Sequence, residues 1–301
     1  LFMYYFIVSF LLLVVVIISL FNNKKLIISL IKLLKWLIIL GFLAHTFGLG
    51  IRWYISGHAP WSNGYESMIY IAWATILSGI IYTKKSALTL AATAMISALL
   101  LMVAHLNWLD PEITNLVPVL KSYWLMIHVA IITASYGFLL LGSILGFISP
   151  WLVIFTNSNN KSKLQNTLSE LTIINEKTLE VGLFMLTIGT FLGGVWANES
   201  WGRYWGWDPK ESWALVSILV YAFVLHMRFI PSLTGKLVLN SVSMFAIWTI
   251  VMTYFGVNYY LSGLHSYAAG DPIPIPTFVY YLLTLMVVTA ILAKIKYKKY
   301  Y

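Results

Sequence analysis

The chain has 301 residues, of which 60% are hydrophobic and only 10% are charged, and its mean hydropathy is +0.84. This composition excludes a pair of soluble globular domains and indicates a protein that crosses a membrane several times. The absence of cysteine excludes a disulfide, a thiol nucleophile and a thiolate metal site, so histidine and methionine remain as ligands for a soft metal or a cofactor.

Nine stretches are long and apolar enough to cross a hydrocarbon core about 30 Å thick. They are residues 1–21, 37–51, 67–82, 88–106, 123–149, 179–197, 212–230, 238–260 and 276–293. The predicted fold class is therefore an all-α, polytopic integral membrane protein with about nine transmembrane helices. The second stretch is short and could begin earlier, near Leu26. The polar segment 157–180 predicts a connection with some amphipathic helix.

Basic residues predict the orientation of the chain. All but four of its 19 lysines and arginines fall on one side of the predicted membrane, which the positive-inside rule makes cytoplasmic. The N-terminus is then outside and the C-terminus is cytoplasmic. The net charge of +9 reflects this topology, so no nucleic-acid partner is expected. The predicted division is a helix and cytoplasmic loop over 1–36, followed by one domain over 37–301.

Residues 201–212, WGRYWGWDPKES, form an outer loop rich in tryptophan. An interfacial aromatic belt accounts for one or two tryptophans per loop. It does not account for a cluster in which Gly202 and Gly206 alternate with bulky rings, a pattern that favours backbone approaching a flat ligand. The alternative is a packed interfacial loop. Asp208 followed by proline predicts the start of the next helix.

Two histidines are expected at the level of this loop. His128 lies six residues into its span, roughly 9 Å below the outer edge, and His265 lies in a neighbouring outer loop. His226 is 15 residues beyond Glu211, about 22 Å deeper, and cannot share a metal with the other two. For each histidine the alternative is a hydrogen-bonded core residue. Two imidazoles beside flat aromatic walls suit haem iron better than zinc, which usually has cysteine or carboxylate ligands.

The motifs that carry these residues resemble a known family. WGRYWGWDPKESWAL at 201–215 is similar to the WWD signature of membrane proteins that handle haem. SYWLMIHVAIITASYGFLLL at 122–141, LHMRF at 225–229, GVNYYLSGLHSY at 256–267 and GHAPWSNGYESMIYIAWA at 57–74 resemble CcsA of System II cytochrome c biogenesis, which also occurs as the C-terminal part of fused CcsBA synthases. The resemblance covers the chain from about residue 40 onward.

The resemblance implies a function and a set of site residues. It implies that haem b is bound at an extracytoplasmic WWD site between His128 and His265, and that the C-x-x-C-H thiols of apocytochrome c form thioether bonds there. The implied cofactor-binding loop residues are Trp201, Gly202, Arg203, Trp205, Gly206, Trp207 and Asp208. A second haem within the membrane would be ligated by His226 and by a residue of the partner CcsB.

The expected enzyme is thus a holocytochrome c synthase, a thioether-forming lyase, acting as a complex or fusion with CcsB. The expected location is a bacterial inner membrane with the site facing the periplasm, or a thylakoid membrane. The alternative is a haem exporter or chaperone that delivers haem without attaching it. A quinol oxidoreductase subunit is a weaker alternative, because it would show paired histidines at both depths. Arg203, Lys210 and Arg52 are candidate partners of the haem propionates, and their ranking stays open.

Overall fold

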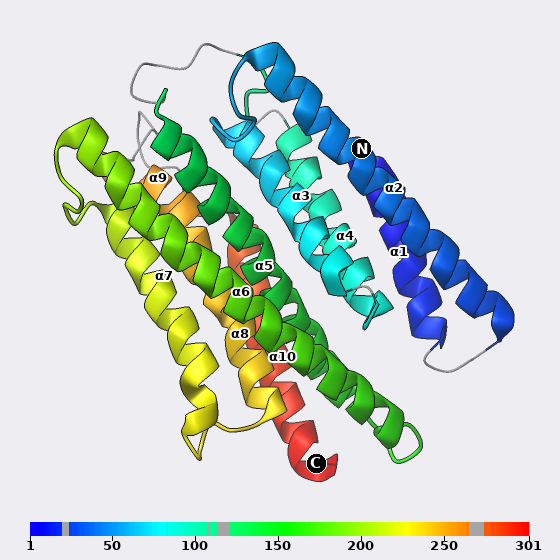
Figure 1. Ribbon diagram of the computed structural model, residues 1–301. Coiled ribbons are helices and arrows are strands. Elements are labelled where there is room, and N and C mark those ends of the chain that lie inside the picture. Colours follow the sequence, from blue (N-terminus) through cyan, green and yellow to red (C-terminus); the bar gives the residue numbers. More distant parts are fainter. Residues whose placement is uncertain (20–23, 83, 107–108, 114–120, 265–273, 301) are drawn as a thin grey trace.

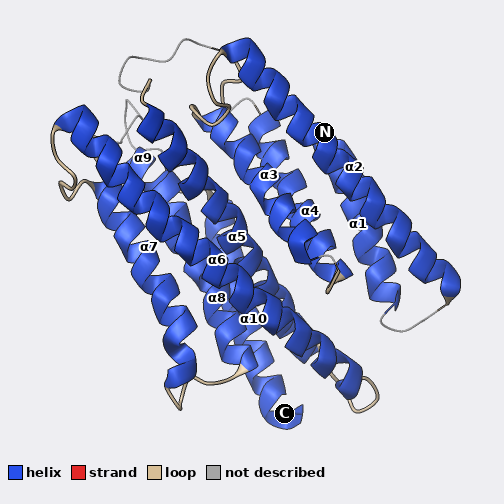
Figure 2. Cartoon of the chain, in the orientation of Figure 1, coloured by secondary structure: helices blue, strands red, loops and turns tan. Residues whose placement is uncertain are grey.

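The computed structural model describes residues 1–19, 24–82, 84–106, 109–113, 121–264 and 274–300, and in these residues the regular structure is helical throughout (Figures 1 and 2). The helices are α1 (Phe2–Ser19), α2 (Lys25–Ser56), α3 (Gly64–Tyr82), α4 (Ala87–His105), α5 (Tyr123–Ile154), α6 (Lys161–Trp201), α7 (Pro209–His226), α8 (Lys236–Val251), α9 (Val257–Tyr260) and α10 (Thr277–Tyr300). A 3₁₀ turn, η2 (Met227–Phe229), follows α7, and a π-helical turn, η3 (Met252–Gly256), joins α8 to α9.

Nine helical stretches within the described residues are long and apolar enough to span a membrane, which confirms the predicted fold class. The α8–η3–α9 segment counts as one of them, from Lys236 to Tyr260. The helices run side by side in two groups, α1–α4 and α5–α10, and α3 packs against α5 where the groups meet (Figure 1).

Two helices are longer than predicted from the sequence. The second begins at Lys25, which agrees with the alternative start near Leu26 and not with a start at residue 37. The segment has no proline, and its lysines are good helix formers. The predicted domain boundary at residue 36 falls inside this continuous helix, and the division itself stays a prediction.

The sixth helix begins at Lys161 rather than at residue 179, so the expected connection over 157–180 is mostly helix. Its first turns place Leu164, Leu168, Leu171 and Ile174 on one face, and all four side chains are buried. The hydropathy of the sequence predicted only the most apolar part of this helix. The helical periodicity continues beyond it.

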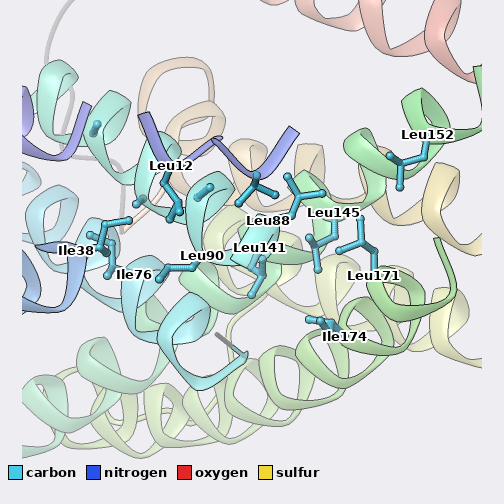
Figure 3. Close-up of a cluster of buried hydrophobic side chains, with 14 of the residues drawn as sticks. Leu12, Ile38, Ile76, Leu88, Leu90, Leu141, Leu145, Leu152, Leu171 and Ile174 are labelled. Carbon is cyan, nitrogen blue, oxygen red and sulfur yellow. The ribbon is translucent and has the colours of Figure 1, made fainter. Parts of the chain in front are cut away.

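The main core lies among α1 to α6. Buried leucine and isoleucine side chains from all six helices form a continuous row through it (Figure 3). A polar contact joins α6 to α8 inside the bundle, where the amide of Asn175 donates to Asn240 Oδ1 and to Ser243 Oγ, both at 2.8 Å. Such bonds satisfy polar groups that have no access to water and fix the register of the two helices.

The described loops gather at the two ends of the bundle. The loops at 57–63 and 202–208 lie at one end with α9, and the turns at 155–160 and 230–235 lie at the other with the C-terminus (Figure 1). The start of α5, the end of α6 and the start of α7 therefore meet at the first end, and this arrangement positions the tryptophan loop beside His128.

Candidate functional site

The tryptophan loop is a short, strongly held turn between α6 and α7. Helix α6 ends at Gly202, which adopts a left-handed conformation with φ of 71° and donates to Asn198 O at 2.9 Å. Helix α7 begins after Asp208, which forms a reciprocal capping box with Glu211. The predicted helix start at Asp208–Pro209 is confirmed. Between the two helix ends, Trp207 also has a positive φ of 59°, which is unusual for a bulky residue and is typical of functional loops.

Glu211 holds the loop together. Its carboxylate accepts hydrogen bonds from the backbone N–H groups of Gly206 at 2.8 Å and Asp208 at 3.2 Å. It also pairs with Arg203 Nη1 at 3.4 Å. A Cβ on Gly206 would overlap the Arg203 guanidinium, so any larger residue there would require the arginine side chain to move. The loop is preorganised by one carboxylate that the sequence reasoning did not single out, although an Asp-x-x-Glu pattern at a helix start is a recognisable capping signal.

The tryptophans of the cluster have different environments. Trp196 is 2% exposed and packs edge-on against Trp201, with ring centroids 4.7 Å apart. Trp205 and Trp207 also pack edge-on, at 5.8 Å, and Trp207 is 71% exposed. The cluster therefore combines a buried anchor with an exposed aromatic surface. Of the predicted ligand platform, Trp207 is the ring most accessible from outside.

Asp208 is buried and its carboxylate contacts backbone rather than solvent. It accepts from Lys210 N at 3.1 Å and from Leu264 N at 2.7 Å. The second bond joins the tryptophan loop to the segment that follows α9. Asp208 was predicted to contact the cofactor, and this stays a prediction. In the structure its carboxylate fixes two pieces of backbone.

His128 lies on α5, with its ring against α6. Its Nδ1 is 2.6 Å from Gly189 O. A carbonyl oxygen only accepts, so Nδ1 carries the proton and donates this bond. This is the arrangement that metal-bound histidines adopt, with one nitrogen held by a backbone carbonyl and the other suited to the metal.

A cavity of about 70 Å³ lies between His128 and the tryptophan loop. It is lined by His128, Tyr204, Trp205, Lys210 and Glu211, among others. A space of this size holds one or two water molecules. A macrocycle is several times larger, so its ring would extend beyond the cavity or displace the loop outward.

His226 lies at the far end of α7 and is exposed. Its Nδ1 is 2.7 Å from Ala222 O, so this imidazole also donates to a backbone carbonyl through Nδ1. The length of α7 places it about 22 Å from Glu211, as predicted. His128 and His226 therefore belong to different sites.

The second predicted outer ligand, His265, lies outside the described residues. The nearest described residue is Leu264, which is held by Asp208. Within the described part of the chain there is no group of three or more histidine, aspartate or glutamate side chains that could hold a bare metal ion. The three other histidines lie elsewhere: His45 is buried beside Tyr5, His58 lies in the loop after α2 with its Nδ1 3.3 Å from Ala59 O, and His105 contacts Phe2 at the end of α4.

The three candidate partners of the haem propionates also differ. Arg52 is engaged by the fully buried Glu66 at 2.9 Å and by Pro111 O at 3.0 Å. Lys210 donates to Asn258 Oδ1 at 2.8 Å and lines the cavity. Arg203 lies in the tryptophan loop itself and is half-buried. Position favours Arg203 and Lys210 over Arg52.

The sequence pattern of the cytochrome c assembly protein family matches residues 61–265. The chain belongs to this family. The protein NrfI of Wolinella succinogenes is 50% identical over 242 residues, which cover 80% of this chain and 26% of NrfI. CcsA of Guillardia theta is 36% identical over 256 residues, which cover 76% of this chain and 83% of that CcsA. CcsA of Chlamydomonas reinhardtii is 37% identical over 229 residues, which cover 72% of this chain and 63% of that CcsA.

These relatives confirm the resemblance to CcsA. The family member described here is a multi-pass membrane protein of cytochrome c biogenesis. It matches most of Guillardia CcsA but only about a quarter of the length of NrfI. The matched residues include His128, the whole tryptophan loop and His226, so all three features lie within the part of the chain that matches the family.

Proposed function

We propose that this protein binds haem b between His128 and His265, beside the tryptophan loop, and presents it to apocytochrome c for thioether formation. The observation that carries the proposal is the way in which the His128 ring is held. Its Nδ1–H is committed to Gly189 O at 2.6 Å, and its ring lines the same cavity as Trp205. An imidazole fixed by a backbone carbonyl next to a flat aromatic ring suits an axial ligand of haem iron.

The loop residues would supply the rest of the binding surface. Trp207 and Trp205 offer flat rings, and Arg203 and Lys210 offer positive charge for the propionates. Glu211 and Asp208 would hold these groups in place through backbone contacts. Preorganisation of this kind converts an encounter of two reactants into a local reaction.

The chemistry would need no thiol from this chain. Each thioether forms when one S–H of the apocytochrome C-x-x-C-H motif adds across one vinyl C=C of the haem, so a C–S bond forms and the hydrogen moves to the other vinyl carbon. No oxidant is consumed. The chain contains no cysteine that could compete for the vinyl groups. We therefore infer a holocytochrome c synthase, acting with CcsB as a complex or a fusion.

His226 would ligate a second haem within the membrane. It is exposed on α7, and its Nδ1 is held by Ala222 O, so a helix of another chain could reach its Nε2. We propose CcsB as the supplier of the other ligand. The tryptophan loop would face the periplasm of a bacterial inner membrane, or the equivalent side of a thylakoid membrane, because most basic residues fall at the opposite end.

The first test is the absorption spectrum of the detergent-purified protein co-expressed with CcsB. We compare wild type, His128→Ala/His265→Ala, His226→Ala, and His105→Ala as a control histidine on α4. We expect wild type to show the absorption of low-spin haem. The double variant should lose only the absorption from haem at the outer site, and His226→Ala should lose only the absorption from haem within the membrane. The control variant should match wild type. A wild type without haem, or a double variant with an unchanged spectrum, contradicts the proposal.

A second measurement separates the synthase from an exporter or chaperone. Haem that stays with a co-expressed c-type cytochrome after denaturation is covalently attached. The synthase predicts such haem with wild type and its loss with the double variant. Haem transfer without covalent attachment would favour the exporter.

A further inference from the structure

Glycines of α6 mark the points where α5 approaches it most closely. A Cβ built on Gly182 would lie 2.5 Å from Leu139 Cδ2, and one on Gly189 would lie 3.0 Å from Ile132 Cβ. A Cβ on Gly193 would lie 2.6 Å from His128 Cε1. The three glycines are separated by the same intervals as the three side chains of α5 that they face. His128 is therefore the last member of a row of α5 side chains that fit over α6 glycines.

Gly193 differs from the other two in what it contacts. A Cβ at Gly189 would meet the backbone nitrogen of Ile132 at 3.1 Å, which is the ordinary use of glycine where membrane helices cross. A Cβ at Gly193 would meet three ring atoms of His128: Cε1 at 2.6 Å, Nδ1 at 2.9 Å and Nε2 at 3.2 Å. The imidazole thus lies across the Cα of Gly193 while Nδ1 donates to Gly189 O, one helical turn away.

The next residue, Gly194, faces the tryptophan loop. A Cβ there would lie 3.0 Å from the backbone oxygen of Tyr204. Gly193, Gly194, His128 and Tyr204 all line the cavity described above. Two adjacent glycines therefore let a histidine from one helix and the backbone of the tryptophan loop approach the same turn of α6.

We propose that Gly193 and Gly194 are positioning residues for the outer site. Gly193 fixes the plane of the His128 imidazole, and Gly194 fixes the distance between that imidazole and the tryptophan loop. The proposal deepens the function proposed above and rests on it for the role of haem. The coupling between Gly193 and His128 follows from the contacts of the chain alone and can be tested without haem.

The first arm is a double-mutant cycle on thermal stability of the haem-free protein. Gly193→Ala places a methyl against the imidazole, and overpacking of this kind is expected to lower the melting temperature by about 3 °C. In a His128→Ala background the ring is absent, so the same methyl should not lower the melting temperature. Gly50→Ala is the matched control, because this α2 glycine has nothing within 4 Å of its built Cβ. Equal losses in both backgrounds would show that Gly193 serves helix packing only, and would overturn the inference.

The second arm measures haem. Changes to groups that orient a metal-bound histidine typically weaken metal affinity by about 10- to 100-fold. Gly193→Ala and Gly194→Ala are each expected to weaken haem retention at the outer site by about tenfold or more, with the inner share of the spectrum unchanged. Gly50→Ala should match wild type.

The outcomes separate this inference from the proposed function. If wild type binds no haem at the outer site, the proposed function fails, while the melting cycle still decides whether Gly193 and His128 are coupled. If wild type binds haem and both glycine variants retain it equally well, the positioning role is wrong and the proposed function stands.

Discussion

The carboxylate of Asp208 accepts a 2.7 Å hydrogen bond from the backbone N–H of Leu264. This bond joins the tryptophan loop to a segment 56 residues further along the chain. A Cβ on Gly263 would overlap Asp208 Oδ1, so the two segments touch at this point. The aspartate of the tryptophan motif therefore connects two parts of the same end of the bundle.

Replacement of Asp208 should lower the free energy of unfolding by more than the loss of a helix cap alone. Loss of an N-cap typically costs about 1 kcal/mol of unfolding free energy, and loss of the second, partly buried hydrogen bond to Leu264 N adds about 1 kcal/mol. Asp208→Ala is expected to lower the melting temperature and to speed hydrogen exchange at Leu264. Asn63→Ala is the matched control, because Asn63 Oδ1 accepts from Glu66 N at 2.8 Å, a local bond at the start of α3. Unchanged exchange at Leu264 in Asp208→Ala would contradict the role assigned to this bond.

Glu211 should matter more to the tryptophan loop than its ionic partner Arg203. Glu211→Ala leaves the N–H groups of Gly206 and Asp208 unpaired, whereas Arg203→Ala removes one ion pair at 3.4 Å. We expect Glu211→Ala to destabilise the protein by about 2 kcal/mol or more and Arg203→Ala by at most about 1 kcal/mol. Limited proteolysis within 202–208, with the melting temperature, measures both. Glu180→Ala removes a surface pair with Lys177 and should change neither. Equal effects of Glu211→Ala and Arg203→Ala would contradict this ranking.

Arg52 should act on stability rather than on haem binding. Its partner Glu66 is fully buried, so Arg52→Ala leaves a buried carboxylate without its cation, a change that typically costs about 3–5 kcal/mol. The loss should appear in the haem-free protein. Arg52→Ala/Glu66→Gln should recover part of it, because the buried charge is also removed. A variant of normal stability that loses haem would instead make Arg52 a propionate partner.

Much of the fold was predictable from residues taken a few at a time. Long apolar stretches predicted nine spans because a hydrocarbon core requires about 20 apolar residues per helix. The helix ends were less predictable. Helix α6 continues into a polar segment because Leu164, Leu168 and Leu171 bury one face, and average hydropathy does not detect a face.

For the candidate site too, some features were predictable from the sequence and others depend on the tertiary structure. The sequence by itself determined the local features: the tryptophan loop, the helix start at Asp208–Pro209, and the separate depths of His128 and His226, because these depend on spacing along one segment. Only the tertiary structure decided that Gly189 and Gly193 hold the His128 imidazole, and that Asp208 binds Leu264. Those contacts join residues more than 50 positions apart. They depend on how two helices cross and how closely their backbones approach, which no pattern within a single segment specifies.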